Sequence, residues 1–330
     1  MLDLKRLKKL RLHRRPFGQV VLADTVMRVD YNWPRPTEII LEGVGNIPVD
    51  RPVFFAMNHT DRYNYWPFQY QMYRQGLPRF TATWVKGKYY ENAVMARFFD
   101  ATNNIPVPSR GYVITTEFRK LMKRPPSESG YRTLRDIVDG KALPDIAELE
   151  PEVREMVERF GDGERANDTA TFRERFDALF DAMMQEVVRL NRAALFTHDC
   201  NVLVFPEGTR SVRLQRGFTG LMQMAQHVGV DIVCVGSNGA DKVYPGNSPL
   251  AKGGRIVYRI APPLSLDGPE LGPYRVRAEF TPFTRQATDR HGDAFEGATR
   301  VMMARISELL DPEYRSDGTI GGTQGAARFM

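Results

Sequence analysis

The chain has 330 residues and a net charge of +6, with 42% hydrophobic and 26% charged residues, which is typical of a globular protein with a sizeable core. Its two cysteines, Cys200 and Cys234, exclude a disulfide-rich framework and favour a reducing compartment. No apolar run reaches the roughly 18 residues of a membrane-spanning helix, and the basic start lacks the apolar core of a signal peptide, so we expect a protein made in the cytoplasm.

The first 15 residues hold seven Lys or Arg and one Asp, whereas the rest of the chain has equal numbers of basic and acidic residues. Such an arm favours an anionic surface, either lipid headgroups or nucleic acid, with a frayed, solvated terminus as the alternative. The five leucines of the arm scatter around a helical wheel, so the argument for attachment is charge. Because no other segment resembles a nucleic-acid module, we expect a membrane lipid surface as partner and no nucleic acid.

The chain divides by composition into three parts. We expect a basic arm and lead-in over 1–37, one domain over 38–314, and a flexible, glycine-rich tail over 315–330. Residues 38–57 predict two strands separated by a Gly/Pro/Asp turn. The aromatic-rich stretch 63–99 is expected to lie mostly in the core, although its density also permits an apolar surface that meets a membrane or an acyl chain.

Strands and helices alternate along the remainder of the chain, which predicts the α/β class. A polar, charged stretch over about 115–170 interrupts this alternation and holds one short acidic helix. The predicted elements are a short strand within 101–112, an amphipathic helix over 172–187, a strand over 202–205, a helix near 217–228, strands over 230–235 and 255–264, and a last helix over 293–310.

Two short motifs follow predicted strands. His59, one of five histidines, comes directly after the strand that ends before Asn58; taken alone, a structural histidine is the commoner interpretation. The strand at 202–205 ends on the turn Pro-Glu-Gly-Thr-Arg, in the position where α/β folds place their chemistry. Arg210 can hold a phosphate through two parallel hydrogen bonds, and Gly208 allows close backbone approach. Glu207 can orient that arginine or accept a hydroxyl proton.

Together these segments resemble the glycerophospholipid acyltransferase superfamily, which includes the lysophosphatidate acyltransferases. The family's third block, F-P-E-G-T-R-S, matches residues 205–211 letter for letter, and Asn58-His59 match the start of its first block. The stretch "NNIPVPSR" at 103–110 approximates the second block. The resemblance covers roughly residues 38–112 and 175–310. It implies a single domain with a central mixed, largely parallel sheet flanked by helices. The long gap between the second and third blocks implies a mostly helical insertion at about 115–170, which can cap the acyl or headgroup site.

The resemblance also implies an activity. The family transfers a fatty acyl group from acyl-CoA or acyl carrier protein to a hydroxyl of a lysophospholipid, with lysophosphatidate as our first expectation for this chain. His59 would be the general base. Glu207, Gly208, Thr209 and Arg210 would hold the phosphate of the acceptor. The resemblance implies no metal and no cofactor beyond the acyl donor, and a peripheral enzyme at the cytoplasmic face of the cell membrane.

This chain departs from the family pattern at two places. Asn64 stands where the family has the aspartate that supports the histidine, and Asp61 lies off register. Either Asn64 orients His59, or Asp61 substitutes through a different turn, or the site is weak. In the second block Arg110 falls one position late, so it is either a second phosphate contact or a solvated turn arginine.

These departures keep two other functions open. The first is a catalytically weak or silent relative that binds lipid or acyl-CoA. The second is an acyltransferase whose acceptor is an aminolipid or glycolipid, for which Arg210 would bind a different anion.

Overall fold

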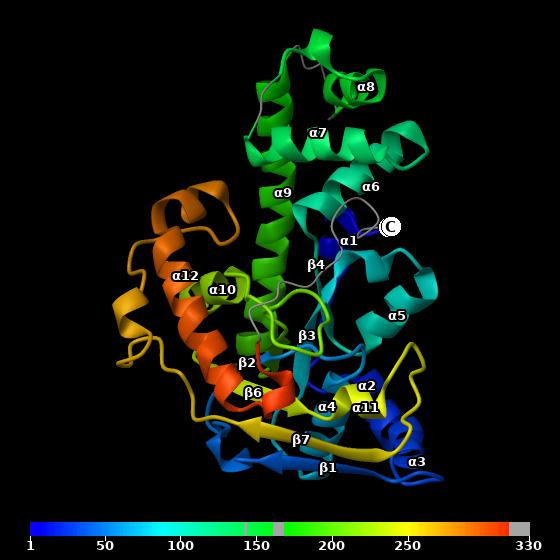
Figure 1. Cartoon of the computed structure of the whole chain (residues 1–330), viewed down its shortest axis with the longest axis vertical. Coiled ribbons are helices and arrows are strands. Elements are labelled where there is room, and N and C mark those ends of the chain that lie inside the picture. The colour runs from blue at the N-terminus through cyan, green and yellow to red at the C-terminus, as the bar shows by residue number, and fades with distance from the viewer. Residues whose placement is uncertain (142–143, 161–167, 317–330) are drawn as a thin grey trace.

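The structure is a computed structural model that describes residues 1–141, 144–160 and 168–316. Most of the predicted tail and part of the predicted insertion (142–143 and 161–167) lie outside the described residues. At its centre is a seven-stranded sheet of order β1-β7-β6-β2-β5-β3-β4 (Figure 1). The strands are β1 (Thr37–Glu42), β2 (Phe54–Met57), β3 (Thr81–Lys86), β4 (Asn104–Val107), β5 (Asn201–Val204), β6 (Ile232–Asn238) and β7 (Gly254–Ile260).

The five strands from β6 to β4 run parallel, whereas β7 is antiparallel to β6 and pairs in parallel with β1. The prediction of a central mixed, largely parallel sheet is therefore confirmed. β2 lies between β5 and β6, and β3 lies on the other side of β5. The carboxyl ends of these neighbouring strands consequently meet at one edge of the sheet, which is where α/β folds bind their ligands.

Helices cover both faces of the sheet, as predicted. Alternate side chains of β2 divide the core, because Phe54 and Ala56 pack with one hydrophobic cluster and Phe55 and Met57 with the other. The helices are α1 (Leu4–Lys9), α2 (Phe17–Leu22), α3 (Arg28–Asp30), α4 (Tyr65–Arg74), α5 (Ala93–Ala101), α6 (Arg110–Met122), α7 (Glu128–Asp139), α8 (Pro151–Arg159), α9 (Thr169–Arg192), α10 (Gly220–Val228), α11 (Ala240–Val243) and α12 (Arg285–Glu308). A π-helical turn (Ala23–Met27) joins α2 to α3.

The described part of the predicted insertion is helical. Helices α6, α7, α8 and the upper half of α9 project from the sheet as a lobe, and α9 runs from this lobe down to the strands (Figure 1). The apolar stripe predicted for α9 is buried, and the rings of Phe172 and Phe176 pack against Phe160 with centroid separations of 5.2 and 6.1 Å. The hydrophobic core of the lobe is therefore continuous with the core on one face of the sheet.

The basic arm is folded against the domain. Helix α1 ends at Lys9, and the chain continues in an extended conformation in which buried Leu10 and Leu12 alternate with exposed Arg11 and His13. The leucines do not share one helical face because the segment changes from helical to extended periodicity. The carbonyl of Leu7 accepts a hydrogen bond from Arg189 of α9. The arm is thus anchored by its leucines and by the ion pair of Arg6 with Asp100, and it presents Lys5, Lys8 and Lys9 to solvent.

Candidate active site

The loops that follow β2 and β5 meet at the carboxyl edge of the sheet. The backbone N–H of His59 donates to Oε1 of Glu207 at 2.7 Å, and the N–H of Ser211 donates to the carbonyl of His59 at 2.9 Å. The two motifs singled out in the sequence are therefore neighbours, although His59 and Glu207 are 148 positions apart. Pairing of β2 with β5, which aligns Phe54 with Val202, brings about this approach.

Glu207 joins the two loops through its carboxylate. The side chain is only 1% exposed, and its second oxygen, Oε2, accepts the backbone N–H of Gln215 at 2.8 Å. Burial raises the pKa of Glu207 to about 7, and the two backbone hydrogen bonds oppose that rise. The sequence suggested that Glu207 orients Arg210 or accepts a proton; in the structure both oxygens are occupied by backbone amides.

The turn that carries Glu207 also requires a glycine. The N–H of Gly208 donates to the carbonyl of Phe205 at 3.1 Å, and Pro206 lies between them with a fixed φ that suits this tight turn. Gly208 has φ = 61°, and an added Cβ would lie 3.2 Å from the exposed ring of Phe218. Thr209 is half-buried and Arg210 is exposed, so the turn directs its last residues outward.

The imidazole of His59 lies half-buried against the ring of Phe205, with centroids 4.0 Å apart and planes inclined by 14°. Its Nδ1 is buried and has no hydrogen-bond partner among the described residues, so Nε2 is the nitrogen that remains accessible. Burial, with the positive charges of Arg210 and Lys86 as lesser causes, lowers the pKa of His59 to about 3. The ring is consequently neutral near pH 7 and able to accept a proton.

Asn64, and not Asp61, is the side chain beside the His59 ring. Asn64 is fully buried, its Nδ2 donates to the carbonyl of Asn58 at 2.8 Å, and it is the one neighbour that raises the pKa of His59. Its Oδ1 and the Nδ1 of His59 nevertheless do not meet at full hydrogen-bond geometry. Asp61 instead accepts from the Thr60 hydroxyl at 2.9 Å and from the N–H of Tyr63 at 2.7 Å, which fixes the turn before α4.

Two cations act on the imidazole. Arg210 forms no hydrogen bond or ion pair with any residue that the structure describes, yet its charge reaches His59. Lys86 ends β3, the neighbour of β5, and acts on the same ring. Lys86 was missed in the sequence, where its signal is a lysine that ends an apolar strand-like run at 81–86.

Arg110 lies elsewhere in the fold. It begins α6, where it pairs with Asp177 of α9 and stacks over the ring of Phe180, with its guanidinium carbon 4.7 Å from the ring centre. Neither contact involves the loop that follows β5. In the structure Arg110 therefore ties the helical lobe together.

Asn58 connects the His59 loop to a third strand. Its Nδ2 donates to the carbonyl of Ser237 at 3.0 Å, and its Oδ1 accepts the N–H of Ser237 at 2.7 Å. Since Ser237 belongs to β6, the loops after β2 and β5 and the end of β6 are held as one unit. This rigid support favours a fixed position for the imidazole.

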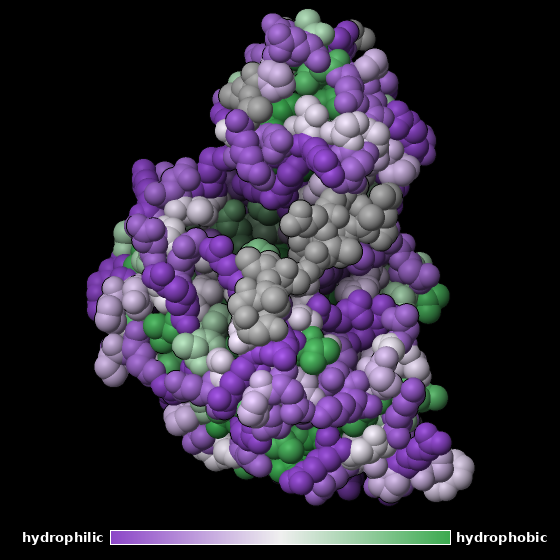
Figure 2. Space-filling view, viewed as in Figure 1, coloured by the Kyte–Doolittle hydropathy of each residue, from purple (hydrophilic) through white to green (hydrophobic). Residues whose placement is uncertain are grey.

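An apolar surface adjoins the cationic end of β3. Trp84 and Lys86 lie on the same side of the strand, because side chains alternate between its two faces. The indole of Trp84 donates to Asn191 of α9 at 2.8 Å, and its ring lies 6.1 Å from Phe283. Figure 2 shows a hollow between the helical lobe and the α10–α12 side of the molecule, with hydrophobic residues at its floor.

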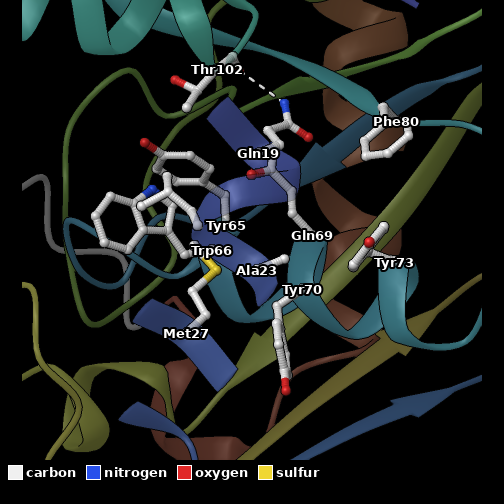
Figure 3. A pocket seen from close by; sticks show the side chains of 11 residues that line it. Gln19, Ala23, Met27, Tyr65, Trp66, Gln69, Tyr70, Tyr73, Phe80 and Thr102 are labelled. Carbon is white, nitrogen blue, oxygen red and sulfur yellow. Dashed lines mark hydrogen bonds between the residues drawn. The ribbon is translucent and has the colours of Figure 1, made fainter. Parts of the chain in front are cut away.

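A second recess lies on the opposite side of the sheet, between α4 and the segment formed by α2 and the π-helical turn. Figure 3 shows Tyr65, Trp66 and Met27 among its walls. The ring of Tyr65 lies 6.2 Å from Phe205, the residue on which His59 stacks. This recess therefore lies close to the candidate site, on the face of the sheet that α4 covers.

Within the ranges that the structure describes, no group of three or more His, Cys, Asp or Glu side chains is arranged to hold a metal ion. Both cysteines are free and buried, and burial raises the pKa of Cys200 to about 12. The described chemistry at the edge of the sheet thus consists of one neutral imidazole, two cations and a set of backbone-bound polar groups.

No protein-family model matches the chain, and no curated protein matches its sequence. Among solved structures, the chain is similar to the crystal structure of the 1-acyl-sn-glycerophosphate (LPA) acyltransferase PlsC from Thermotoga maritima. The two share 15% sequence identity with a TM-score of 0.40, and the match covers 93% of this chain and 79% of that one.

Proposed function

We propose that this protein transfers a fatty acyl group from a thioester donor, acyl-CoA or acyl carrier protein, to a hydroxyl of a lysophospholipid, with lysophosphatidate as the first acceptor to test. The observation that carries the proposal is the direct hydrogen bond between His59 and the carboxylate of the F-P-E-G-T-R-S turn. It joins the two motifs of the family resemblance and leaves a neutral imidazole beside two cations.

In the proposed reaction Nε2 of His59 takes the proton of the acceptor hydroxyl while that oxygen attacks the thioester carbonyl carbon. The tetrahedral intermediate then collapses, the carbon–sulfur bond breaks, and the thiolate leaves with the proton that His59 returns. A base positioned in this way contributes about 10²–10⁴-fold to the rate. The hydrogen bond of Ser211 to the His59 carbonyl and that of Glu207 to its amide support this position.

Arg210 and Lys86 bind the phosphate of the acceptor in this proposal. Their positive charges contribute to the low pKa of His59 in the free protein. A phosphate between them offsets part of that field, so binding of the acceptor raises the pKa of the ring and makes it a stronger base. The acceptor is thereby both positioned and deprotonated at the same place.

We assign the transferred acyl chain to the apolar surface that starts at Trp84. Trp84, Phe283 and the exposed ring of Phe218 border the end of the sheet that carries Lys86 and Gly208. The hollow with a hydrophobic floor in Figure 2 lies on the same side of the molecule as the helical lobe. The lobe would then act as a cap over the acyl chain.

We further propose that the protein works at a lipid surface and reaches it through the helix that follows the basic arm. Phe17, Val21 and Val29 recur at spacings of four and eight residues and are exposed, Phe17 by 78% of its surface, and Trp33 follows at 72%. Exposed aromatic and aliphatic side chains with basic neighbours are typical of interfacial helices. Helix α1 packs against α9, and its exposed Lys5, Lys8 and Lys9 add attraction to anionic headgroups. No helix among the described residues is long and apolar enough to cross a bilayer.

The decisive experiment is to incubate the purified protein with an acyl thioester and a panel of lysolipids and to identify products by mass spectrometry. His59→Ala should abolish product formation, whereas His198→Ala, which removes a half-buried histidine elsewhere, should not. Circular dichroism of both variants reports whether they fold. An active, folded His59→Ala variant would remove His59 from the mechanism.

A catalytically silent lipid-binding protein is the second candidate. The observation that favours it is the buried Nδ1 of His59, which lacks the carboxylate partner that a strong base would have. Binding of lysolipid or acyl-CoA without any product, at all donor and acceptor combinations, would support this candidate over the enzyme.

The lipid surface is tested by flotation with vesicles that contain anionic phospholipid. Phe17→Glu should reduce the bound fraction strongly, because it places a charge in the proposed contact. Phe196→Glu is the matched control, since Phe196 is also exposed but belongs to the π-helical turn Ala193–Thr197 and not to the proposed contact. Equal binding of the two variants would contradict the assigned surface.

A further inference from the structure

The segment that follows α12 returns to the edge of the sheet that carries the candidate site. Tyr314 is only 1% exposed, although it lies in a short 3-10 turn (Pro312–Tyr314) near the end of the described chain. Its hydroxyl donates to Oδ1 of Asp241 at 2.7 Å and accepts the N–H of Gly239 at 3.1 Å. Gly239 is the N-cap of α11 and Asp241 lies within α11, directly after β6, so Tyr314 is anchored at the start of this helix.

The backbone of Tyr314 reaches the other loop of the site. Its carbonyl accepts the N–H of Leu214 at 2.8 Å, and the next amide, that of Gln215, donates to Glu207. Glu207 in turn accepts the N–H of His59. An unbroken series of hydrogen bonds and adjacent peptide units therefore runs from the hydroxyl of Tyr314 to the backbone of His59.

Two neighbouring contacts hold this segment in register. The N–H of Asp311 donates to Oδ1 of Asn238 at 2.8 Å, and Arg259 pairs with the carboxylate of Asp311 at 2.8 Å. The segment is thus fixed to β6 and β7, and the contact with Leu214 transmits this fixed position to the loop after β5.

We propose that Tyr314 is a positioning residue of the site: its buried hydroxyl fixes the segment whose carbonyl holds the 205–215 loop, and that loop holds His59. The inference rests on the proposed function where kcat is measured, whereas the measurement of hydrogen exchange does not depend on that function. Small displacements of a base relative to its substrate lower the rate far more than they lower stability.

Tyr314→Phe tests the proposal in the full chain, because it removes the hydroxyl and keeps the ring. Tyr112→Phe is the matched control: the Tyr112 hydroxyl is also buried and also accepts a backbone N–H, that of Leu2, at 3.1 Å. We expect Tyr314→Phe to lose somewhat more stability in thermal unfolding, because its hydroxyl makes two hydrogen bonds and that of Tyr112 accepts one. Tyr314→Phe alone should lower kcat, by about tenfold, with a smaller change in KM for lysophosphatidate.

Hydrogen exchange measured by mass spectrometry supplies a readout that does not need activity. In Tyr314→Phe the amides of residues 206–216 should exchange about tenfold faster than in the wild type, while in Tyr112→Phe they should not change. If Tyr314→Phe does not fold, Asp241→Ala removes the acceptor of the hydroxyl and is measured in the same way.

The outcomes separate the two proposals. A wild-type protein without acyl transfer would contradict the proposed function, whereas the exchange comparison would still decide the role of Tyr314. An active wild type whose Tyr314→Phe variant matches Tyr112→Phe in kcat and in exchange would overturn the positioning role alone.

Discussion

Replacing Glu207 by glutamine should make the stability of the variant, relative to the wild type, increase with pH while it inactivates the site. The carboxyl has a pKa of about 7 in the fold against an ordinary value of 4.5, because burial disfavours its charged form. The folded state therefore binds this proton more tightly than the unfolded state does between these two values. Stability contributed by this group falls as pH rises from about 4.5 to about 7 and stays constant above.

The size of the effect follows from that interval. At about 1.4 kcal/mol per pH unit, the ionised carboxylate lowers the free energy of unfolding by up to roughly 3 kcal/mol above pH 7. Glutamine is uncharged at every pH and has no such dependence. The free energy of unfolding of Glu207→Gln, relative to the wild type, should rise by about 2.5 kcal/mol between pH 5 and pH 8.

The kcat of Glu207→Gln should be lower than that of the wild type. Whichever way the glutamine amide lies, its NH₂ group faces either the N–H of His59 or that of Gln215, so one of two short hydrogen bonds is lost. We expect kcat to fall by at least about tenfold, because the loops no longer hold their positions.

Urea unfolding at pH 5 and pH 8, together with kcat at pH 8, measures both quantities. Glu207→Asp is the control, since it keeps the charge but is too short to reach both amides. A stability difference that does not grow with pH would refute the argument from burial, and a fully active Glu207→Gln would refute the link between the loops.

Three further predictions concern neighbouring residues. His59 has a pKa of about 3 in the fold, below its ordinary 6.5, so its contribution to stability is complete above pH 6.5 and is lost as pH falls towards 3. In His59→Gln the free energy of unfolding, measured in urea, should therefore depend less on pH over this range. Arg210→Ala should raise KM for a phosphorylated acceptor by about tenfold or more and change kcat less, because the contact exists before the transition state, whereas Arg213→Ala should change neither greatly. Asn64→Asp should lower the free energy of unfolding by about 1–3 kcal/mol, because it removes the donor to the Asn58 carbonyl. If the protein is an enzyme, the same substitution should raise kcat per folded molecule. Unchanged stability would show that this hydrogen bond is unimportant.

Local sequence patterns predicted many elements of this fold, because burial imposes its period directly on the chain. The apolar spacing of α9 and the strands β5 and β6 follow from residues close together in sequence. The arm shows where this reasoning is wrong: a single helical wheel was applied to a segment that is helical only to Lys9 and then extended.

The approach of His59 to the turn at 205–211 depended on a resemblance, because nothing local in the sequence says that β2 lies between β5 and β6. The partners of Glu207 could not be predicted for a related reason. They are backbone amides, which every residue carries, so no residue type marks them. Lys86 could be assigned to the site only once the strand order was known, because it ends β3 and β3 lies beside β5. Tyr314 could not be assigned from the strand order, because its contacts are set by the return of the chain after α12.

The position of β2 also sets the order in which this protein can fold. Its four apolar residues, Phe54–Met57, pair on one side with β5 and on the other with β6. β5 is synthesised about 150 residues later and β6 about 180 residues later, so a nascent chain emerges with its future central strand unpaired on both edges. Such long-range pairing is slow, and the exposed strand is open to wrong partners until it is complete. We therefore expect refolding yield, more than final stability, to depend on protein concentration.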